Sequence, residues 1–341
     1  MSPSPAASLA EIRRLVADLP GPDLATRTKA VARESTLTKP PGALGRLEAL
    51  AEWMSTWQGK HPPQLRRPRI AVFAGNHGIA ARGVSAYPPA VTGQMVRNFI
   101  AGGAAVNQIC RSVDADLRVY EMSLETPTAD FTIEPAMSDE ECARAMAYGM
   151  MAVESGIDLL AVGEMGIANT TAGAALCHAL FGGTPADWTG PGTGVAGDAL
   201  QRKQAVVAAG VARHAAEAGG DGLEILRRLG GYELAAIAGA VIAARLARVP
   251  VLLDGYTATA AAATLTRLDP RLLDHCQVGH LSAEPAHARL CAQLGLRPLL
   301  DLGMRLGEGS GAALAVAILR AAVECHAGMA TFGDAGVSGP A

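Results

Sequence analysis

The chain has 341 residues and a formal net charge of −3, with 29 lysines and arginines against 32 aspartates and glutamates. Hydrophobic residues make up 50% of the chain, which excludes an intrinsically disordered protein. Because the chain has no basic block, it is not expected to bind nucleic acid. The length predicts one large domain or two, with a core of Ala, Leu and Val, since aromatic residues make up only 4%.

The cysteines and the apolar stretches indicate the cellular compartment of the protein. Six cysteines are scattered without a CxxC pair, which is typical of reduced thiols and predicts a cytoplasmic protein. The first ten residues lack the positive charge of a secretory signal. The most apolar stretch, residues 234–253, is interrupted by two arginines and a proline, so we expect no stable membrane insertion.

The N-terminal segment, residues 1–60, is predicted to be helical. Apolar residues recur at helical spacing over 7–19 and 24–34. A turn with a Pro-Pro-Gly loop signal then begins a third helix, which runs to about residue 57. We expect these helices to form a smaller helical domain together with residues 306–341, which carry the catalytic loop and a C-terminal helix.

The central segment, residues 61–305, alternates strands with helices and is expected to form a large α/β domain. Strands are predicted from short apolar runs at 69–75, 117–122, 158–163, 249–253, 275–278 and 299–302. Helices are predicted around 91–99, at 139–155 and 172–180, around Lys203, and at 223–229, 233–247 and 286–294. The alternation predicts a mainly parallel, Rossmann-like sheet of about six strands with helices on both faces.

The richest polar stretch follows the third predicted strand. Glu164 ends that strand, Gly166 lies in a turn, and Asn169 and Thr170 begin a helix. A glycine turn at a helix start is typical of an anion site, because free backbone N–H groups and the helix dipole favour negative charge. An ordinary helix cap with a solvated glutamate is the alternative.

Other polar residues are weaker candidates. Lys203 follows a glycine-rich loop, which suits a phosphate contact, although lysines at such positions more often lie on the surface. Ser85 and Gln94 follow the first strand and could point into a pocket, and Gly255 ends the fourth. His77 has no partners at metal-ligand spacing, so no metal is expected.

A loop near the C-terminus, with the sequence LGEGSGA, places Glu308 among glycines just before an apolar helix. Ordinary helix-start chemistry is one interpretation, and a carboxylate held close to a ligand is the other. No Walker A motif, GxGxxG turn or GxSxG elbow occurs, which disfavours nucleotide hydrolysis, hydride transfer and serine catalysis. What remains is two carboxylates, Glu164 and Glu308, with glycines and a lysine that could contact phosphate. This combination fits a phosphorylated sugar substrate and one general base.

Several motifs over residues 30–330 resemble the nicotinate-nucleotide:dimethylbenzimidazole phosphoribosyltransferase family. They are TKPPGALGRLE, AGNHGI, GVSAYP, VTGQMV, GEMGIANTT, LLDGYTA, GHLSAEPAH and LGEGSGA. The resemblance implies transfer of the 5-phosphoribosyl group of nicotinate mononucleotide to 5,6-dimethylbenzimidazole, with inversion at C1′, no cofactor, and a homodimer. The product would be α-ribazole 5′-phosphate, a part of the cobalamin nucleotide loop.

The same resemblance implies roles for individual residues. Glu308 matches the catalytic glutamate, and Glu164 a second acidic group near the ribose. The implied phosphate and ribose contacts are Gly166, Asn169, Lys203 and Gly255, and the implied base contacts are Ser85, Gln94, Met165 and Leu306. Three positions depart from the pattern of many members: Asn76 replaces Asp, Ala168 replaces Gly, and Ser310 replaces Thr.

The chemistry of that reaction fits these residues. The pyridine nitrogen of the donor is already positive, so breaking the C1′–N bond releases a neutral ring and needs no acid. The attacking benzimidazole must lose a proton, and a positioned carboxylate that accepts it contributes about 10²–10⁴-fold. We expect burial to raise the pKa of Glu308 more than the helix start lowers it, and Glu164 to stabilise positive charge at C1′. Transfer to another base (adenine, a phenol, another benzimidazole) and a non-catalytic nucleotide- or base-binding protein are the alternatives.

Overall fold

The computed structural model describes residues 8–338, and its centre is a parallel sheet. Five strands follow the order β2-β1-β3-β4-β5, and each neighbouring pair is parallel. The strands are β1 (Pro68–Ala74), β2 (Asp116–Glu121), β3 (Leu159–Met165), β4 (Val251–Leu253) and β5 (Cys276–Val278). The prediction of an α/β fold with a mainly parallel sheet is confirmed.

The sheet has five strands rather than the six expected, because residues 299–302 do not form a strand. Leu300 makes one isolated parallel bridge with His280, and the backbone N–H of Leu299 donates to the Val278 carbonyl at 2.9 Å. Pro298 precedes this segment and has no N–H with which to extend the ladder. Gly303 follows with a φ of +66°, which turns the chain away from the sheet edge.

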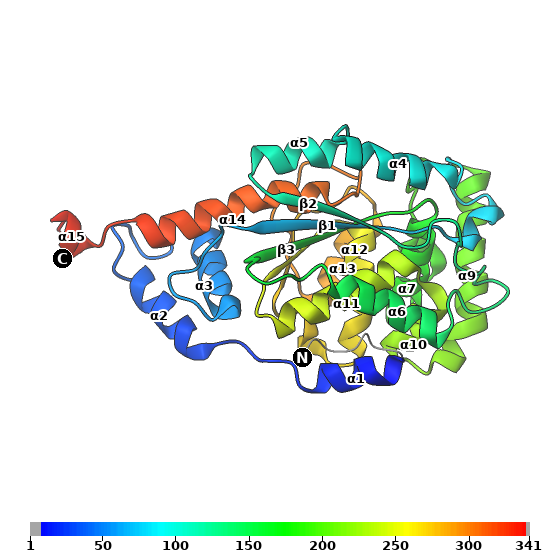
Figure 1. The fold of residues 1–341 in the computed structure, drawn as a ribbon, viewed down its shortest axis with the longest axis horizontal. Helices are drawn as coiled ribbons and strands as arrows, with labels where there is room; N and C mark the ends of the chain where they lie inside the picture. Colours follow the sequence, from blue (N-terminus) through cyan, green and yellow to red (C-terminus); the bar gives the residue numbers. More distant parts are fainter. Residues whose placement is uncertain (1–7, 339–341) are drawn as a thin grey trace.

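The helices cover both faces of the sheet (Figure 1). In chain order they are α1 (Leu9–Ala17), α2 (Leu24–Glu34), α3 (Arg46–Gln58), α4 (Ala90–Ala101), α5 (Ala105–Ser112), α6 (Asp139–Met150), α7 (Asn169–Phe181), α8 (Pro185–Trp188), α9 (Asp198–Ala218), α10 (Gly222–Leu229), α11 (Tyr232–Leu246), α12 (Tyr256–Ala263), α13 (Ala286–Leu294), α14 (Ser310–Gly328) and α15 (Phe332–Ala335). The helix predicted to end at residue 155 stops at Met150. Four helices, α5, α8, α12 and α15, were not predicted from the sequence.

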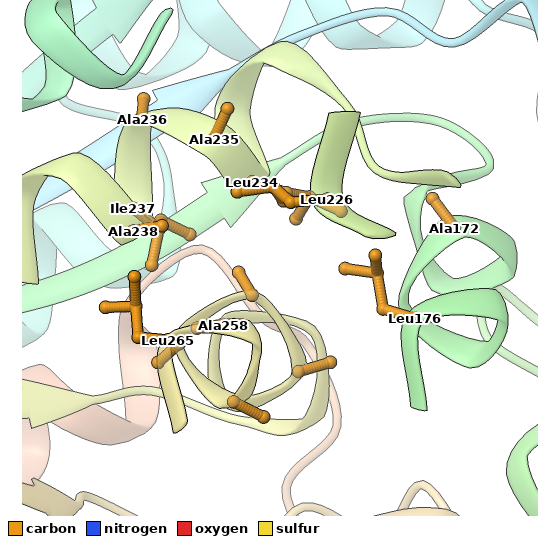
Figure 2. Close-up of a cluster of buried hydrophobic side chains, with 14 of the residues drawn as sticks. Ala172, Leu176, Leu226, Leu234, Ala235, Ala236, Ile237, Ala238, Ala258 and Leu265 are labelled. Carbon is orange, nitrogen blue, oxygen red and sulfur yellow. The ribbon is translucent and has the colours of Figure 1, made fainter. Parts of the chain in front are cut away.

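Alternate residues of β1 divide the core into two clusters. Ala71 and Phe73 face a larger cluster formed with α6, α7, α10, α11 and α12, whereas Ile70 and Val72 face a smaller one formed with α3, α5 and α14. Every residue of β1 is buried, as expected of a strand covered on both faces. Figure 2 shows part of the larger cluster, where short side chains of α7, α11 and α12 meet.

Small residues let these helices approach closely, which explains a core with few aromatics. A methyl group added at Gly149 of α6 would overlap the Ala236 carbonyl of α11. Reciprocally, a methyl group at Gly239 of α11 would overlap the Met146 carbonyl of α6. The two backbones are therefore in direct contact, and dispersion between them replaces the packing of larger side chains.

Helices α2 and α3 lie beside the C-terminal part of α14 at one end of the molecule (Figure 1). Arg33 of α2 donates hydrogen bonds to the carbonyls of His326 and Ala327 at 2.7 and 2.8 Å, and α3 packs against α14. By contrast, α1 packs on α6, where Leu9 and Ile12 join the larger core cluster. The division into residues 1–60, 61–305 and 306–341 stays a prediction.

Among the described residues, α14 alone is long and apolar enough to cross a membrane. Half of that stretch (50%) is buried inside the structure. Its apolar residues, among them Val316 and Leu319, pack in the smaller core cluster. The composition of α14 is therefore that of a helix packed against a sheet.

Candidate functional site

The loops at the carboxyl ends of the strands enclose a cavity of about 330 Å³. Parallel strands bring these ends to one edge, where open α/β sheets place their ligands. The lining residues include Glu164, Met165, Gly166, Asn169 and Thr170 after β3, Gly255 to Thr257 after β4, His280, Ser282 and Glu284 after β5, and Arg305 to Gly307 before α14. A larger cleft of about 1020 Å³ between α2, α3 and η3 (Pro270–Leu273) contains none of the predicted site residues.

Glu308 lies on a tight loop directly over the sheet. Its φ is +63°, and it stands between Gly307 and Gly309, which have φ values of +80° and +74°. Its backbone N–H donates to the Glu164 carbonyl at 3.1 Å. A methyl group at Gly163 would overlap the backbone of Gly309, so the loop rests on β3 itself. A glutamate held in the left-handed region is strained, and such strain gathers at functional sites.

The environment of Glu308 changes its acidity. The side chain is 6% exposed, and burial together with the nearby charge of Asp254 raises its pKa to about 7. This is the direction expected from the sequence. A carboxylate with such a pKa is a much stronger base near neutral pH than a solvated glutamate.

Asp254 secures the start of the helix that follows Glu308, a role that was not predicted from the sequence. Its carboxylate accepts hydrogen bonds from the backbone N–H groups of Gly309 at 3.1 Å and Ala312 at 2.8 Å. It is buried, and burial raises its pKa while His280 and the backbone donors oppose that rise. A carboxylate at a helix N-terminus satisfies donors that have no partner within the helix. The position after β4, in LLDGYTA, was the available signal.

Glu164 lies beside Glu308 at the end of β3. The side-chain amide of Asn169 donates to its carboxylate and so orients it toward the start of α7. Burial raises its pKa to about 8, with smaller contributions from Asp254, Glu233 and Glu308. The structure thus brings the two predicted acidic residues together: Glu164 lines the cavity, and Glu308 lies behind the wall that Gly307 forms.

A buried hydrogen-bonded pair, Glu233 and His77, packs against the end of β3. Glu233 of α11 and His77 form a hydrogen bond of 2.6 Å between Oε1 and Nε2. A methyl group at Gly166 would lie 2.7 Å from the Gly75 carbonyl and 3.2 Å from Glu233 Oε1. Only glycine fits at position 166, because the strand end is pressed against both groups. His77 therefore makes a structural hydrogen bond in the loop.

Lys203 lies behind the cavity wall. Its ammonium group donates to Thr170 Oγ1 at 2.8 Å and to the Gly190 carbonyl at 3.0 Å, and burial lowers its pKa to about 8. It is 1% exposed and does not line the cavity in the described residues. Its contacts hold together the start of α7 and the glycine-rich loop, which are both candidate phosphate contacts.

Charged residues also hold the glycine-rich loop from the side of the cavity. The carboxylate of Glu284 accepts from the Gly192 N–H, and Arg305 donates to the Gly192 carbonyl at 3.0 Å. Together with Lys203 they fix the loop against the strand ends. Neither Glu284 nor Arg305 was predicted. Glu284 lies in the GHLSAEPAH motif, but nothing in its spacing distinguished it from a surface glutamate.

The predicted base contacts are only partly together. Met165 and Leu306 line the cavity with Tyr87. Ser85 lies at its rim, where its hydroxyl is 3.1 Å from Thr193 Oγ1. Gln94 is exposed on α4 and is not among the lining residues, so the structure does not bring it to the cavity. Tyr87 and Thr193 were not predicted.

The chain is similar over most of its length to known phosphoribosyl-transferring enzymes. A family model described as "Phosphoribosyltransferase" matches residues 19–337. By fold and by this match, the chain is a phosphoribosyl-transferring enzyme of the α/β class.

Individual relatives define the family more closely. Two proteins named nicotinate-nucleotide--dimethylbenzimidazole phosphoribosyltransferase are similar: one from Brucella anthropi is 56% identical over 329 residues, and one from Rhizobium etli is 57% identical over 329 residues. Each match covers 96% of this chain and 97% of the relative. A solved structure of that enzyme from Thermus thermophilus is 42% identical, covers 93% of this chain and 100% of its own, and has a TM-score of 0.87. The chain belongs to the nicotinate-nucleotide--dimethylbenzimidazole phosphoribosyltransferase family, which acts in cobalamin biosynthesis.

Proposed function

We propose that the cavity transfers the 5-phosphoribosyl group of nicotinate mononucleotide to 5,6-dimethylbenzimidazole by direct displacement at C1′, with Glu308 as general base. The observation that carries this proposal is a buried glutamate with a pKa of about 7 next to the wall of the cavity. At neutral pH a carboxyl group with that pKa is ionised in a large fraction of the molecules, and the ionised form accepts a proton readily. Neither a metal nor a cofactor is part of the proposal.

The order of the strands suggests how the substrates lie. The Ser85 rim follows β1, Glu164 and Met165 are the last two residues of β3, and Gly255 follows β4. We assign the acceptor base to Ser85 and Met165, the ribose to Glu164, and the phosphate to the far side. Leu306 completes the base end, whereas Gln94 stays a prediction without a supporting contact.

Glu164 then lies nearest the reacting carbon. Negative charge beside C1′ stabilises the positive charge that develops there as the pyridine leaves. Because burial holds its pKa at about 8, this role needs a substrate whose positive ring favours the ionised form of the carboxylate. Gly166, Asn169 and Gly255 supply backbone and amide groups at the ribose and phosphate, and Lys203 holds the walls that present them.

Replacement of Glu308 by glutamine tests the role of the base. Glu308→Gln should bind nicotinate mononucleotide normally but lose about 10²–10⁴-fold in turnover with dimethylbenzimidazole. Turnover is measured by chromatography of released nicotinate. Glu324→Gln is the matched control, because Glu324 is an exposed residue of the same helix. Near-normal turnover of Glu308→Gln would remove Glu308 from the mechanism.

Two other interpretations give different outcomes in the same assay. A non-catalytic binding protein would release no nicotinate with any base. A different preferred acceptor would emerge when dimethylbenzimidazole, adenine, a phenol and other benzimidazoles compete in one mixture. The acceptor end has two large, half-exposed apolar residues, Tyr87 and Leu306 (each 55% exposed), which would contact whichever base is bound.

We also propose that the protein is a cytoplasmic homodimer. All six cysteines are unpaired, which suits a reducing compartment. Leu24 and Val31 of α2 are 62% and 49% exposed and give the N-terminal helices an apolar surface for a second copy. Sedimentation that shows only monomer at micromolar concentration would contradict the dimer.

A further inference from the structure

His280 is a buried residue at the cavity that has no hydrogen-bond partner of its own. It follows β5, its side chain is 1% exposed, and it lines the cavity. Within the described residues neither ring nitrogen makes a hydrogen bond. A buried polar group without a partner is costly and rare, so a site that keeps one is suited to a ligand that completes it.

The neighbouring glycines make room for this imidazole. A methyl group at Gly311 would overlap the ring, and one at Gly255 would lie 3.1 Å from its Nε2 atom. The ring therefore fills the space between the starts of α12 and α14. Asp254 lies beside it, with Oδ1 3.8 Å from Nε2, and its carboxylate is already bonded to the backbone of α14.

The position of His280 in the sheet selects one part of the donor substrate. It follows β5, two strands beyond Glu164 on β3 and three strands beyond β1, the strand that precedes Ser85. Ser282 and the amino end of α12 lie next to it in the cavity wall. Backbone N–H groups at a helix start and an imidazole favour an anion there, and the donor carries its phosphate at the end away from its base.

We propose that His280 binds the donor substrate directly, by donating a hydrogen bond to the 5′-phosphate of nicotinate mononucleotide. The assignment rests on the proposed function, which places the ribose at Glu164. Glu284 also lines this cavity, and its carboxylate accepts from the Gly192 N–H. Both ring nitrogens of His280 are thus free, within the described residues, to contact the phosphate at this end of the cavity.

The test compares two ligands that differ only in the phosphate. Nicotinate mononucleotide and nicotinate riboside are each titrated calorimetrically into the full-length wild type and into His280→Phe, which keeps a ring between Gly255 and Gly311 but has no donor. A hydrogen bond to a charged group corresponds to about 10–100-fold in affinity. We expect that loss for nicotinate mononucleotide and an unchanged dissociation constant for the riboside.

His214→Phe is the matched control. His214 on α9 is also buried and has an unpartnered ring nitrogen, but it bonds to the Phe131 carbonyl and does not line the cavity. It should weaken neither ligand. If His280→Phe does not fold, His280→Leu, which also has no donor, is titrated instead, with thermal melts of each variant as the measure of folding.

Two results would overturn the proposal. Equal losses for both ligands would make His280 a ribose contact or a structural residue, and no loss for either would remove it from the site. The outcome is separate from that of the proposed reaction. If the wild type releases no nicotinate, the proposed reaction is refuted. If the wild type turns over and His280→Phe still binds nicotinate mononucleotide normally, only the phosphate contact is refuted.

Discussion

Replacing the proposed base should make the protein less active and more stable. Burial and Asp254 hold the pKa of Glu308 at about 7 in the folded protein, against an ordinary value of 4.5. The folded state therefore binds the proton more tightly than the unfolded state does. Ionisation of Glu308 opposes folding, and this cost grows as the pH rises from about 4.5 to about 7 and is constant above that.

The size of the effect follows from the two pKa values. Linkage gives a cost of about 1 kcal/mol at pH 5 and about 3 kcal/mol at pH 8. In Glu308→Gln the side chain is neutral at every pH, so the variant avoids this cost. Relative to wild type, its free energy of unfolding should therefore rise by about 2 kcal/mol between pH 5 and pH 8.

Chemical denaturation of both proteins at a series of pH values from 5 to 8 measures this difference. Glu324→Gln serves as the control, since Glu324 is exposed on the same helix. A difference between Glu308→Gln and wild type that does not change with pH would refute the reasoning, because the carboxylate would then titrate alike in the folded and unfolded chains. The assay needs no substrate, so its result is independent of the proposed reaction.

Two further predictions concern the backbone. Ala168 is the N-cap of α7 and has a φ of +79°, a conformation that costs an L-residue about 1 kcal/mol. Ala168→Gly should therefore raise the melting temperature by about 1–3 °C. An unchanged or lower melting temperature in calorimetry would contradict this prediction. A methyl group at Gly163 would overlap the backbone of Gly309, so Gly163→Ala should destabilise the fold by about 1–3 kcal/mol and reduce turnover more than tenfold. Gly328→Ala, where nothing lies within 4 Å of the added methyl group, is the control, and equal effects of the two substitutions on melts and turnover would contradict the proposed overlap.

The sequence was sufficient for the features that have a local signal. The buried run of β1 and the glycines around Glu308 each indicate their structure within a few residues. Residues 299–302 show the limit of such signals, since an apolar run of strand length makes only one bridge when Pro298 removes a donor. The α12 helix, rich in alanine and threonine, has no polar face and so offered no periodic pattern.

Residues that act through distant contacts left no such signal. Asp254 follows β4 as many aspartates follow strands, and only the fold brings the start of α14 to its carboxylate. Lys203 stays a predicted phosphate contact, and its spacing did not indicate that its ammonium group donates to Thr170 and a loop carbonyl behind the cavity wall. Gln94 shares a motif with buried residues but lies on the exposed face of α4. Which way a side chain faces depends on the partner element, and the sequence does not contain that information locally.

Glycine at two crossing points explains why Glu308 has the acidity of a base. Gly163 on β3 and Gly279 after β5 are the two crossing points. A methyl group at Gly163 would overlap the backbone of Gly309, and one at Gly279 would overlap the backbone of Ala312. The start of α14 can therefore lie directly on the sheet edge, within hydrogen-bond distance of Asp254. The same close approach removes water from Glu308 and brings a second negative charge near it, and both effects raise its pKa. Larger residues at these crossings would lift the helix, expose the carboxylate to water and return it to the weak basicity of an ordinary glutamate.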